Sequence, residues 1–229
     1  MKLGIMQPYF LPYIGYFQLM NYVDKYVIYD DVNFINKGWI NRNKILLNGT
    51  DFRFNLLLLG ASQNKLINEI SVDDNQTKLL KTIEIAYKKT YYFQDVFPII
   101  ESIVNYKDNN LAQYIGNSIE QISKYLQMNT EFIYSSNIEK NNSLKAQAKI
   151  IHICSLLGAT EYVNSIGAKD LYDKYIFKQN GIELFFLKTG TIQYKQFKNE
   201  FVPNLSILDV LMFNSVEEVR GILNKFELV

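Results

Sequence analysis

Hydrophobic and polar positions fall in short blocks along the chain, and the N-terminal part shows this most clearly. Residues 2–6 form an apolar run ended by Gln-Pro, which predicts a strand. Apolar residues recur close to a 3.6-residue period over 14–23, which predicts a helix, and residues 26–29 predict a second strand. A strand, a helix and a strand within about 30 residues form a βαβ unit, whose two strands run parallel.

A polar loop and a hairpin are predicted after this unit. Residues 33–43 contain many amides and cations and only scattered apolar residues, which is typical of a loop. The stretches 45–47 and 52–59 flank the turn signal Asn48-Gly49, so we expect a hairpin or a strand at the sheet edge. A helical period then appears in three stretches: 76–89, 95–106 and 110–127.

Strands and helices alternate again in the C-terminal half. We expect strands at 131–134, 161–164 and 182–187, and helices at 144–157, at 168–177 and from 205 onward. Such alternation implies an α/β fold with a mostly parallel, Rossmann-like sheet and helices on both faces. We expect one domain, 1–229, that carries a helical insert at 76–127. Gly158 and Gly181 each follow a predicted helix and suit the left-handed position after a helix end.

Composition limits the classes of partner. The chain has 24 Lys and Arg against 23 Asp and Glu, so nothing favours binding to nucleic acid. No stretch approaches the roughly 18 uninterrupted apolar residues of a membrane span, and the first residues lack the apolar run of a secretion signal. We therefore expect no membrane partner and a cytoplasmic location. The single cysteine, Cys154, excludes an internal disulfide and a thiolate-clustered metal site.

Polar and aromatic side chains gather where the first predicted strand ends. Gln7, Tyr9, Tyr13 and Tyr16 surround the strand-to-helix turn, and Gly15 lets backbone come close to a ligand. The N–H groups at the start of the helix favour a phosphate or a carboxylate. Open α/β sheets bind ligands at the carboxyl ends of their strands, so these residues are candidates for substrate binding. The alternative is that they only shape a rigid loop.

Two acids end the second predicted strand. Alternation along a strand points Asp30 and Asp31 to opposite faces, so one of them can face a cleft. An acid there can orient an amine, act as a general base or bind a metal, whereas an acid on the surface is only solvated. Neither has a partner at a metal-ligand spacing, so we assign no metal site.

The predicted loop 33–43 is the most unusual string in the chain. Lys37 and Arg42 can bind phosphate or carboxylate, and Trp39 offers a face for stacking. Asn41 and Asn43 supply both donors and acceptors. This set suits a nucleotide, a sugar or an acyl carboxylate, and the alternative is an ordinary polar loop.

Ser165, His152 and Cys154 are the remaining residues whose type could carry chemistry. Ser165 closes another predicted strand just before a helix, where it can contact a ligand or cap the helix at 168–177. His152 is the only histidine, but it lies in the apolar helix at 144–157 with no acid beside it, so it receives no catalytic role. Cys154 in the same helix is expected in the core.

The chain resembles the WbqC-like family of bacterial proteins over nearly its whole length. Four strings carry the resemblance: QPYFLPYIGYFQLMNYVDKYVIYDDV, KGWINRN, YVNSIGAKDLYD and LSILDVLMFN. Membership implies a role in the biosynthesis of bacterial surface polysaccharides such as O-antigen, on routes to acylated or aminoacylated amino sugars.

A second similarity concerns the fold. The order strand, P-x-x-G loop, helix and strand is similar to the start of nucleotidylyltransferases and pantothenate synthetase, where an H-x-G-H signature grips nucleotide phosphates. Here the string is Tyr13-Ile14-Gly15-Tyr16. Tyrosine donates a hydrogen bond but carries no positive charge at neutral pH, so the phosphate-stabilising role does not carry over directly.

Three functional hypotheses follow. The first is an enzyme that forms an amide between a nucleotide-linked amino sugar and an acyl or aminoacyl group. The second is a nucleotidyltransferase or adenylate-forming ligase that uses ATP and magnesium. The third is a non-catalytic module that binds a nucleotide sugar or a partner enzyme. In the first hypothesis Asp30 or Asp31 orients or deprotonates the amine, Lys37, Arg42 and Asn43 bind phosphate or the developing oxyanion, and Gln7 and Tyr16 position the substrate.

Overall fold

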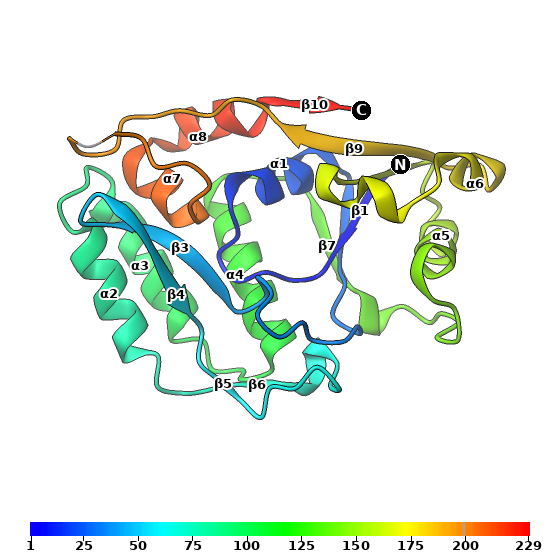
Figure 1. Ribbon diagram of the computed structural model, residues 1–229, viewed down its shortest axis with the longest axis horizontal. Helices are drawn as coiled ribbons and strands as arrows, with labels where there is room; N and C mark the ends of the chain where they lie inside the picture. The colour runs from blue at the N-terminus through cyan, green and yellow to red at the C-terminus, as the bar shows by residue number, and fades with distance from the viewer. Residues whose placement is uncertain (199) are drawn as a thin grey trace.

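A mostly parallel six-stranded sheet lies at the centre of the computed structural model, which describes residues 1–198 and 200–229 (Figure 1). The strand order is β10-β9-β8-β1-β2-β7, and only β10 runs antiparallel to its neighbour. The strands are β1 Lys2–Met6, β2 Lys25–Ile28, β7 Glu131–Tyr134, β8 Glu161–Ser165, β9 Glu183–Thr189 and β10 Phe226–Leu228. The chain is therefore a mixed α/β protein, as predicted.

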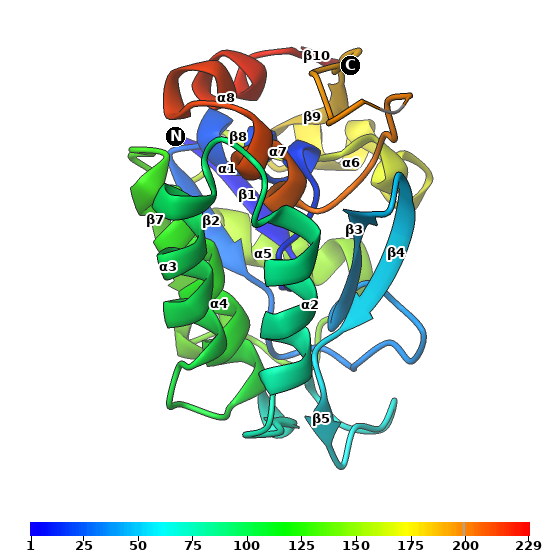
Figure 2. The same cartoon turned by 90° about the vertical axis from the view of Figure 1, so that its left-hand side faces the viewer.

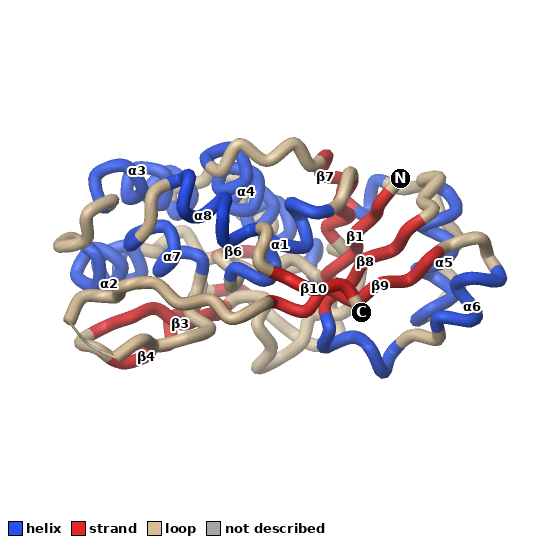
Figure 3. The backbone as a smooth tube through the Cα atoms, turned by 90° about the horizontal axis from the view of Figure 1, so that it is seen from above, coloured by secondary structure: helices blue, strands red, loops and turns tan. Residues whose placement is uncertain are grey.

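Helices cover both faces of this sheet. Helices α5 (Ala146–Leu156) and α6 (Lys174–Gln179) lie on one side, with α1 (Ile14–Tyr22) and α4 (Leu111–Tyr125) on the other (Figure 3). Leu3 and Val27 belong to the core under α5, whereas Tyr26 and Ile28 belong to the core around α1. Alternate strand residues point to opposite faces, so a sheet buried on both faces requires nearly continuous apolar strands.

Three helices between β6 and β7 form a layer beside the sheet, and they stand in the foreground of Figure 2. They are α2 Thr77–Tyr87, α3 Phe93–Val104 and α4, which confirms the three predicted helical stretches. Residues Ile115, Ile119 and Ile122 of α4 are buried, three or four positions apart, as a helix that packs on one side requires. The Asn110 side chain caps α4 by accepting hydrogen bonds from two backbone N–H groups.

The predicted hairpin forms, and it is separate from the central sheet. Strands β3 (Arg42–Leu47) and β4 (Thr50–Asn55) pair antiparallel around the Asn48-Gly49 turn, so the sheet-edge alternative is wrong. Strand β3 begins inside the predicted loop because Arg42 and Asn43 already pair with β4. A second small pair follows, made of β5 Leu58–Leu59 and β6 Ser71–Val72, with the 3₁₀ turn η1 Ile67–Glu69 between them.

The helix predicted over 168–177 is wrong. Residues Ile166–Leu171 wind as the 3₁₀ segment η3, and α6 starts only at Lys174, because the Asp173 side chain caps a new helix by accepting from the Tyr175 N–H. Another 3₁₀ turn, η2 (Ser135–Asn137), follows β7.

The C-terminal region is helical from residue 207 and ends in a strand. Helices α7 (Ile207–Phe213) and α8 (Val216–Leu223) agree with the prediction, whereas β10 was not expected. None of the helices in the described residues has the length and apolar character needed to cross a membrane.

Candidate functional site

A hollow of about 410 Å³ brings together segments that are far apart in the sequence. We call it the first hollow. It is lined by Tyr9, Pro12, Tyr13, Trp39, Asn43, Lys44 and Asn204. Four of these are predicted site residues from two separate strings, Tyr9, Tyr13, Trp39 and Asn43.

Hydrogen bonds fix the walls of the first hollow. The Leu11 carbonyl accepts from Asn43 Nδ2 and from Ser206 Oγ, both at 2.7 Å. The Phe10 N–H donates to the Ile40 carbonyl at 2.8 Å. Leu11 has φ of 47°, a left-handed conformation that a leucine adopts only when its surroundings enforce it. The loop after β1 is therefore held by hydrogen bonds to the two other walls of the hollow, which are the segment of Ile40 and Asn43 and the segment of Ser206.

The third wall is attached just as directly. The Ser206 N–H donates to the Lys44 carbonyl and the Ile207 N–H to the Pro12 carbonyl, each at 2.8 Å. These bonds hold the segment that carries Asn204 against β3 and against the loop after β1. The hollow is consequently pre-formed, which is the usual condition of a small-molecule site.

The lining of the first hollow is aromatic and neutral, with one cation. Burial raises the pKa of Tyr9, helped by the nearby Tyr13, so that phenol stays protonated at neutral pH. Burial also raises the pKa of Tyr13, although the Thr189 hydroxyl opposes the shift. The Trp39 side chain is 47% exposed and free to stack. Lys44 supplies the cation and pairs with Asp51 at 2.6 Å.

Two predicted site residues at the start of α1, Gly15 and Tyr16, serve the protein's own packing. A Cβ on Gly15 would collide with the Tyr13 ring and the Thr189 hydroxyl, so the space beside this glycine is already filled. Tyr16 is buried, and its hydroxyl donates to the Gln7 carbonyl. Tyr16 thus holds the start of the loop after β1 through this hydrogen bond. Neither Tyr16 nor Gln7 lines the first hollow.

The amides and cations of the 37–43 stretch are largely engaged with backbone. Asn41 Nδ2 donates to the Leu56 carbonyl at 3.0 Å, and Arg42 Nε donates to the Gly38 carbonyl at 2.5 Å. Lys37 is exposed. None of these three lines the first hollow. Ser165 stands before η3, where its side chain makes no capping hydrogen bond, and it also lies outside the hollow's lining.

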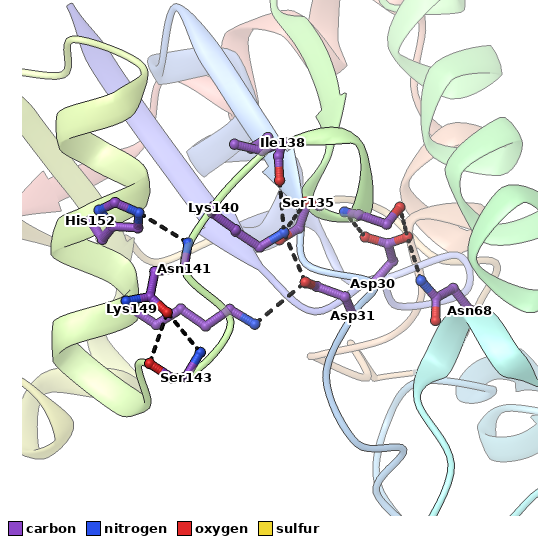
Figure 4. A network of polar contacts seen from close by, with 11 residues as sticks. Asp30, Asp31, Asn68, Ser135, Ile138, Lys140, Asn141, Ser143, Lys149 and His152 are labelled. Atoms are coloured by element: carbon purple, nitrogen blue, oxygen red, sulfur yellow. Dashed lines mark hydrogen bonds and ion pairs between the residues drawn. The ribbon is translucent and has the colours of Figure 1, made fainter.

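Asp30 and Asp31 point to opposite sides, as strand alternation predicts (Figure 4). Asp30 is buried and accepts hydrogen bonds from the Ser136 N–H at 2.9 Å, the Ser136 hydroxyl at 2.6 Å and Asn68 Nδ2 at 3.3 Å. Asp31 Oδ2 pairs with Lys140 at 2.8 Å and Lys149 at 3.4 Å. Neither acid lines the first hollow.

The lysines determine the chemistry of Asp31. Desolvation raises its pKa, but the Lys140 hydrogen bond, the nearby Ser135 hydroxyl and the two lysine charges outweigh this, and the pKa falls below its ordinary value. A carboxylate with a lowered pKa is a weak base. Asp31 Oδ1 is buried without a hydrogen-bond partner, and the Ser135 hydroxyl, although close, is not in hydrogen-bond geometry. Asp31 is therefore better suited to orienting a donor group than to removing a proton.

Sequence reasoning missed several residues of these two clusters. A signal for Lys149 was present in the sequence, because a lysine in the apolar part of a predicted helix is unusual. In the structure its side chain is only 10% exposed. Lys44 borders the predicted string and continues it. Asn204 and Lys140 come from polar loops whose sequence carries no comparable signal.

Comparison with known proteins gives one family and one relative. The WbqC-like protein family matches residues 7–221. The chain is 28% identical over 218 residues to a protein of Mycobacterium tuberculosis named uncharacterized protein Rv1507c, and the alignment covers 93% of each chain. No solved structure matches the chain. The family match includes every strand of the sheet from β2 to β9 and all the residues of the first hollow, and the chain therefore belongs to the WbqC-like protein family.

Proposed function

We propose that this protein is an enzyme of bacterial surface-glycan biosynthesis that forms an amide on a nucleotide-linked amino sugar. The acyl group comes from an activated acyl or aminoacyl donor. The observation that carries the proposal is the first hollow, where Tyr9, Tyr13 and Trp39 meet Asn204 and Lys44 around about 410 Å³.

The lining chemistry supports a sugar nucleotide as the ligand. Aromatic rings stack on the apolar face of a sugar or on a nucleobase, and neutral phenols and amides hydrogen-bond to hydroxyl groups. Lys44 lines the hollow and can bind a phosphate if it gives up its ion pair with the half-exposed Asp51. Among the described residues that line the hollow there is no carboxylate, and the negative charge of Asp51 beside it is paired with Lys44.

The sheet topology supports the same assignment. Numbered in chain order, the five parallel strands lie in the order 3-2-1-4-5, which is the order of Rossmann-like folds. Ligands of such sheets bind at the carboxyl edge beside the point where the order reverses, here between β1 and β8. The loop that follows β1 leads directly into Tyr9 and Tyr13.

The proposed reaction balances as a simple acyl transfer. The sugar nitrogen attacks the acyl carbon, a C–N bond forms, the bond to the donor's leaving group breaks, and the nitrogen loses one proton to solvent. Asp31, kept ionised by its two lysines, lies outside the lining of the first hollow and is assigned no contact with the amine. Asp30 accepts three hydrogen bonds and is assigned to holding this strand end in place.

Product formation tests the proposal. The purified protein is incubated with a dTDP- or UDP-linked amino sugar and a panel of acyl thioesters and aminoacyl donors, with and without ATP and magnesium, and amides are detected by mass spectrometry. We expect an amide product, and we expect Trp39→Ala to lower kcat/KM at least tenfold without altering the melting temperature. Tyr91→Ala, at an aromatic residue that is 88% exposed and outside the lining of the first hollow, is the control and keeps full activity. An adenylylated product, or sugar-nucleotide binding without turnover for any donor, would reject the transferase assignment.

A further inference from the structure

A second hollow of about 290 Å³ adjoins the first. Tyr13 and Asn204 line both, so these two side chains form the boundary between them. The remaining walls come from the start of α1, the end of β9 and the segment that leads into α7. A ligand bound in the first hollow therefore has a second compartment next to it.

The lining of the second hollow differs in character. Six apolar side chains contribute to it: Ile14, Ile192, Phe201, Pro203, Leu205 and Val210. The polar contribution comes from Thr189, Thr191 and Tyr194 and from the shared Tyr13 and Asn204, and no charged side chain takes part among the described residues. Such a surface desolvates an uncharged apolar group favourably and a phosphate or carboxylate unfavourably.

The wall formed by residues 191–198 and 200–203 is held in position although these residues form no helix or strand. The buried Asp209 carboxylate accepts from the Tyr194 hydroxyl at 2.7 Å, from the Tyr87 hydroxyl at 2.9 Å and from Gln196 Nε2. Gln196 also donates to the Val202 carbonyl at 3.1 Å and accepts from the Val202 N–H at 2.7 Å. Asp209 is an acid within the apolar string LSILDVLMFN, and it anchors the segment that carries Tyr194 to α7 and α2.

We propose that the second hollow receives the acyl group, with the amino sugar in the first hollow and the new amide beside Tyr13 and Asn204. This inference rests on the proposed function and makes it more specific. The neutral lining selects an uncharged, apolar acyl group over one that carries a carboxylate. The donor's charged portion stays outside this compartment.

Binding of acylated products tests the inference without requiring turnover. The probes are UDP-glucosamine and dTDP-4-amino-4,6-dideoxyglucose, each free and as its N-acetyl, N-propionyl, N-butyryl and N-succinyl derivative, with dissociation constants measured by calorimetry. We expect affinity to rise by about fourfold for each added methylene until the hollow is filled. The N-succinyl derivative, similar in size to N-butyryl but charged, should bind at least tenfold more weakly than N-butyryl.

A pair of variants locates the effect. Thr191 and Gln193 are both exposed on the same segment, but only Thr191 lines the second hollow. Thr191→Phe should abolish the dependence on acyl length and leave the affinity for the free amino sugar unchanged. Gln193→Phe should preserve both. Because both positions are exposed, both variants are expected to fold, which the melting temperature checks.

The outcomes separate this inference from the proposed function. If the free amino sugars bind but affinity does not depend on the acyl group, or if Thr191→Phe keeps the dependence, the acyl assignment is overturned alone. Equal binding of the N-succinyl and N-butyryl derivatives also overturns it. If no sugar nucleotide of either series binds to the wild-type protein, the first hollow is not a sugar site, and both proposals fall.

Discussion

Asp31 shows how strongly the surroundings of one residue decide its role. The alternation of side chains along a strand indicated that Asp30 and Asp31 would diverge, and they do (Figure 4). The sequence contained no indication that Lys140 would join Lys149 at Asp31, because Lys140 reaches it from a polar loop 109 residues away, the difference between positions 140 and 31. The opposite directions of the two side chains were predictable from the sequence, and their partners were not.

The pairing of Asp31 makes stability dependent on pH. A carboxyl whose pKa is lowered on folding adds stability above its unfolded pKa of about 4 and loses it as the pH falls through the lower folded value. Asp31→Asn leaves the Lys140 ammonium, whose side chain is 2% exposed, without its anion, so we expect a loss of about 3 kcal/mol at pH 7. The loss relative to wild type should shrink between pH 5 and pH 2. Urea unfolding at stepped pH measures both quantities.

An exposed ion pair provides the control for this variant. Glu227 pairs with Lys188 at 3.7 Å with both side chains more than half exposed. Glu227→Gln should change the free energy of unfolding by less than about 1 kcal/mol at every pH. An Asp31→Asn protein with the same acid sensitivity as wild type would show that the lysine pairing does not stabilise the fold.

Secondary-structure elements were predicted well where their pattern was long and their ends carried a signal. Gly158 and Gly181 follow the ends of α5 and α6, and their φ angles of 70° and 74° are left-handed, as predicted for the position after a helix. Elements were missed where tertiary contacts decide: β10 has three residues and exists because β9 offers an edge. The break at Asp173 was readable from its capping residue, but the apolar residues on either side suggested one helix.

Two helical glycines give a prediction with its own control. A Cβ at Gly116 in α4 would collide with the Tyr134 hydroxyl of β7, whereas one at Gly221 in α8 meets nothing within 4 Å. Gly116→Ala should therefore lower the free energy of unfolding by about 1–3 kcal/mol, because either the Tyr134 side chain or α4 must move. Gly221→Ala should raise it by about 0.5–1 kcal/mol through helix propensity. Equal effects of the two substitutions in urea unfolding would contradict this account of how α4 packs.

At the scale of the whole molecule, the first hollow could be predicted only in part. The sequence made the Tyr9–Tyr13 loop and the Trp39–Asn43 stretch candidates for binding, and the fold brings members of both together in one lining. It did not indicate that Asn204 completes the hollow, since that residue is separated from the others by the entire α/β framework. Gln7, Lys37, Arg42 and Ser165 were grouped with the site by their place in the sequence, but they lie outside the lining.

The central claim is that the first hollow binds a nucleotide-linked amino sugar, and a crystal structure of the protein with dTDP-4-amino-4,6-dideoxyglucose or UDP-glucosamine tests it most directly. We expect ligand density in contact with Trp39 and Tyr9, with the sugar amine toward Tyr13 and Asn204. Density at the Asp31–Lys149 cluster or elsewhere, with the first hollow empty at a saturating ligand concentration, would contradict it.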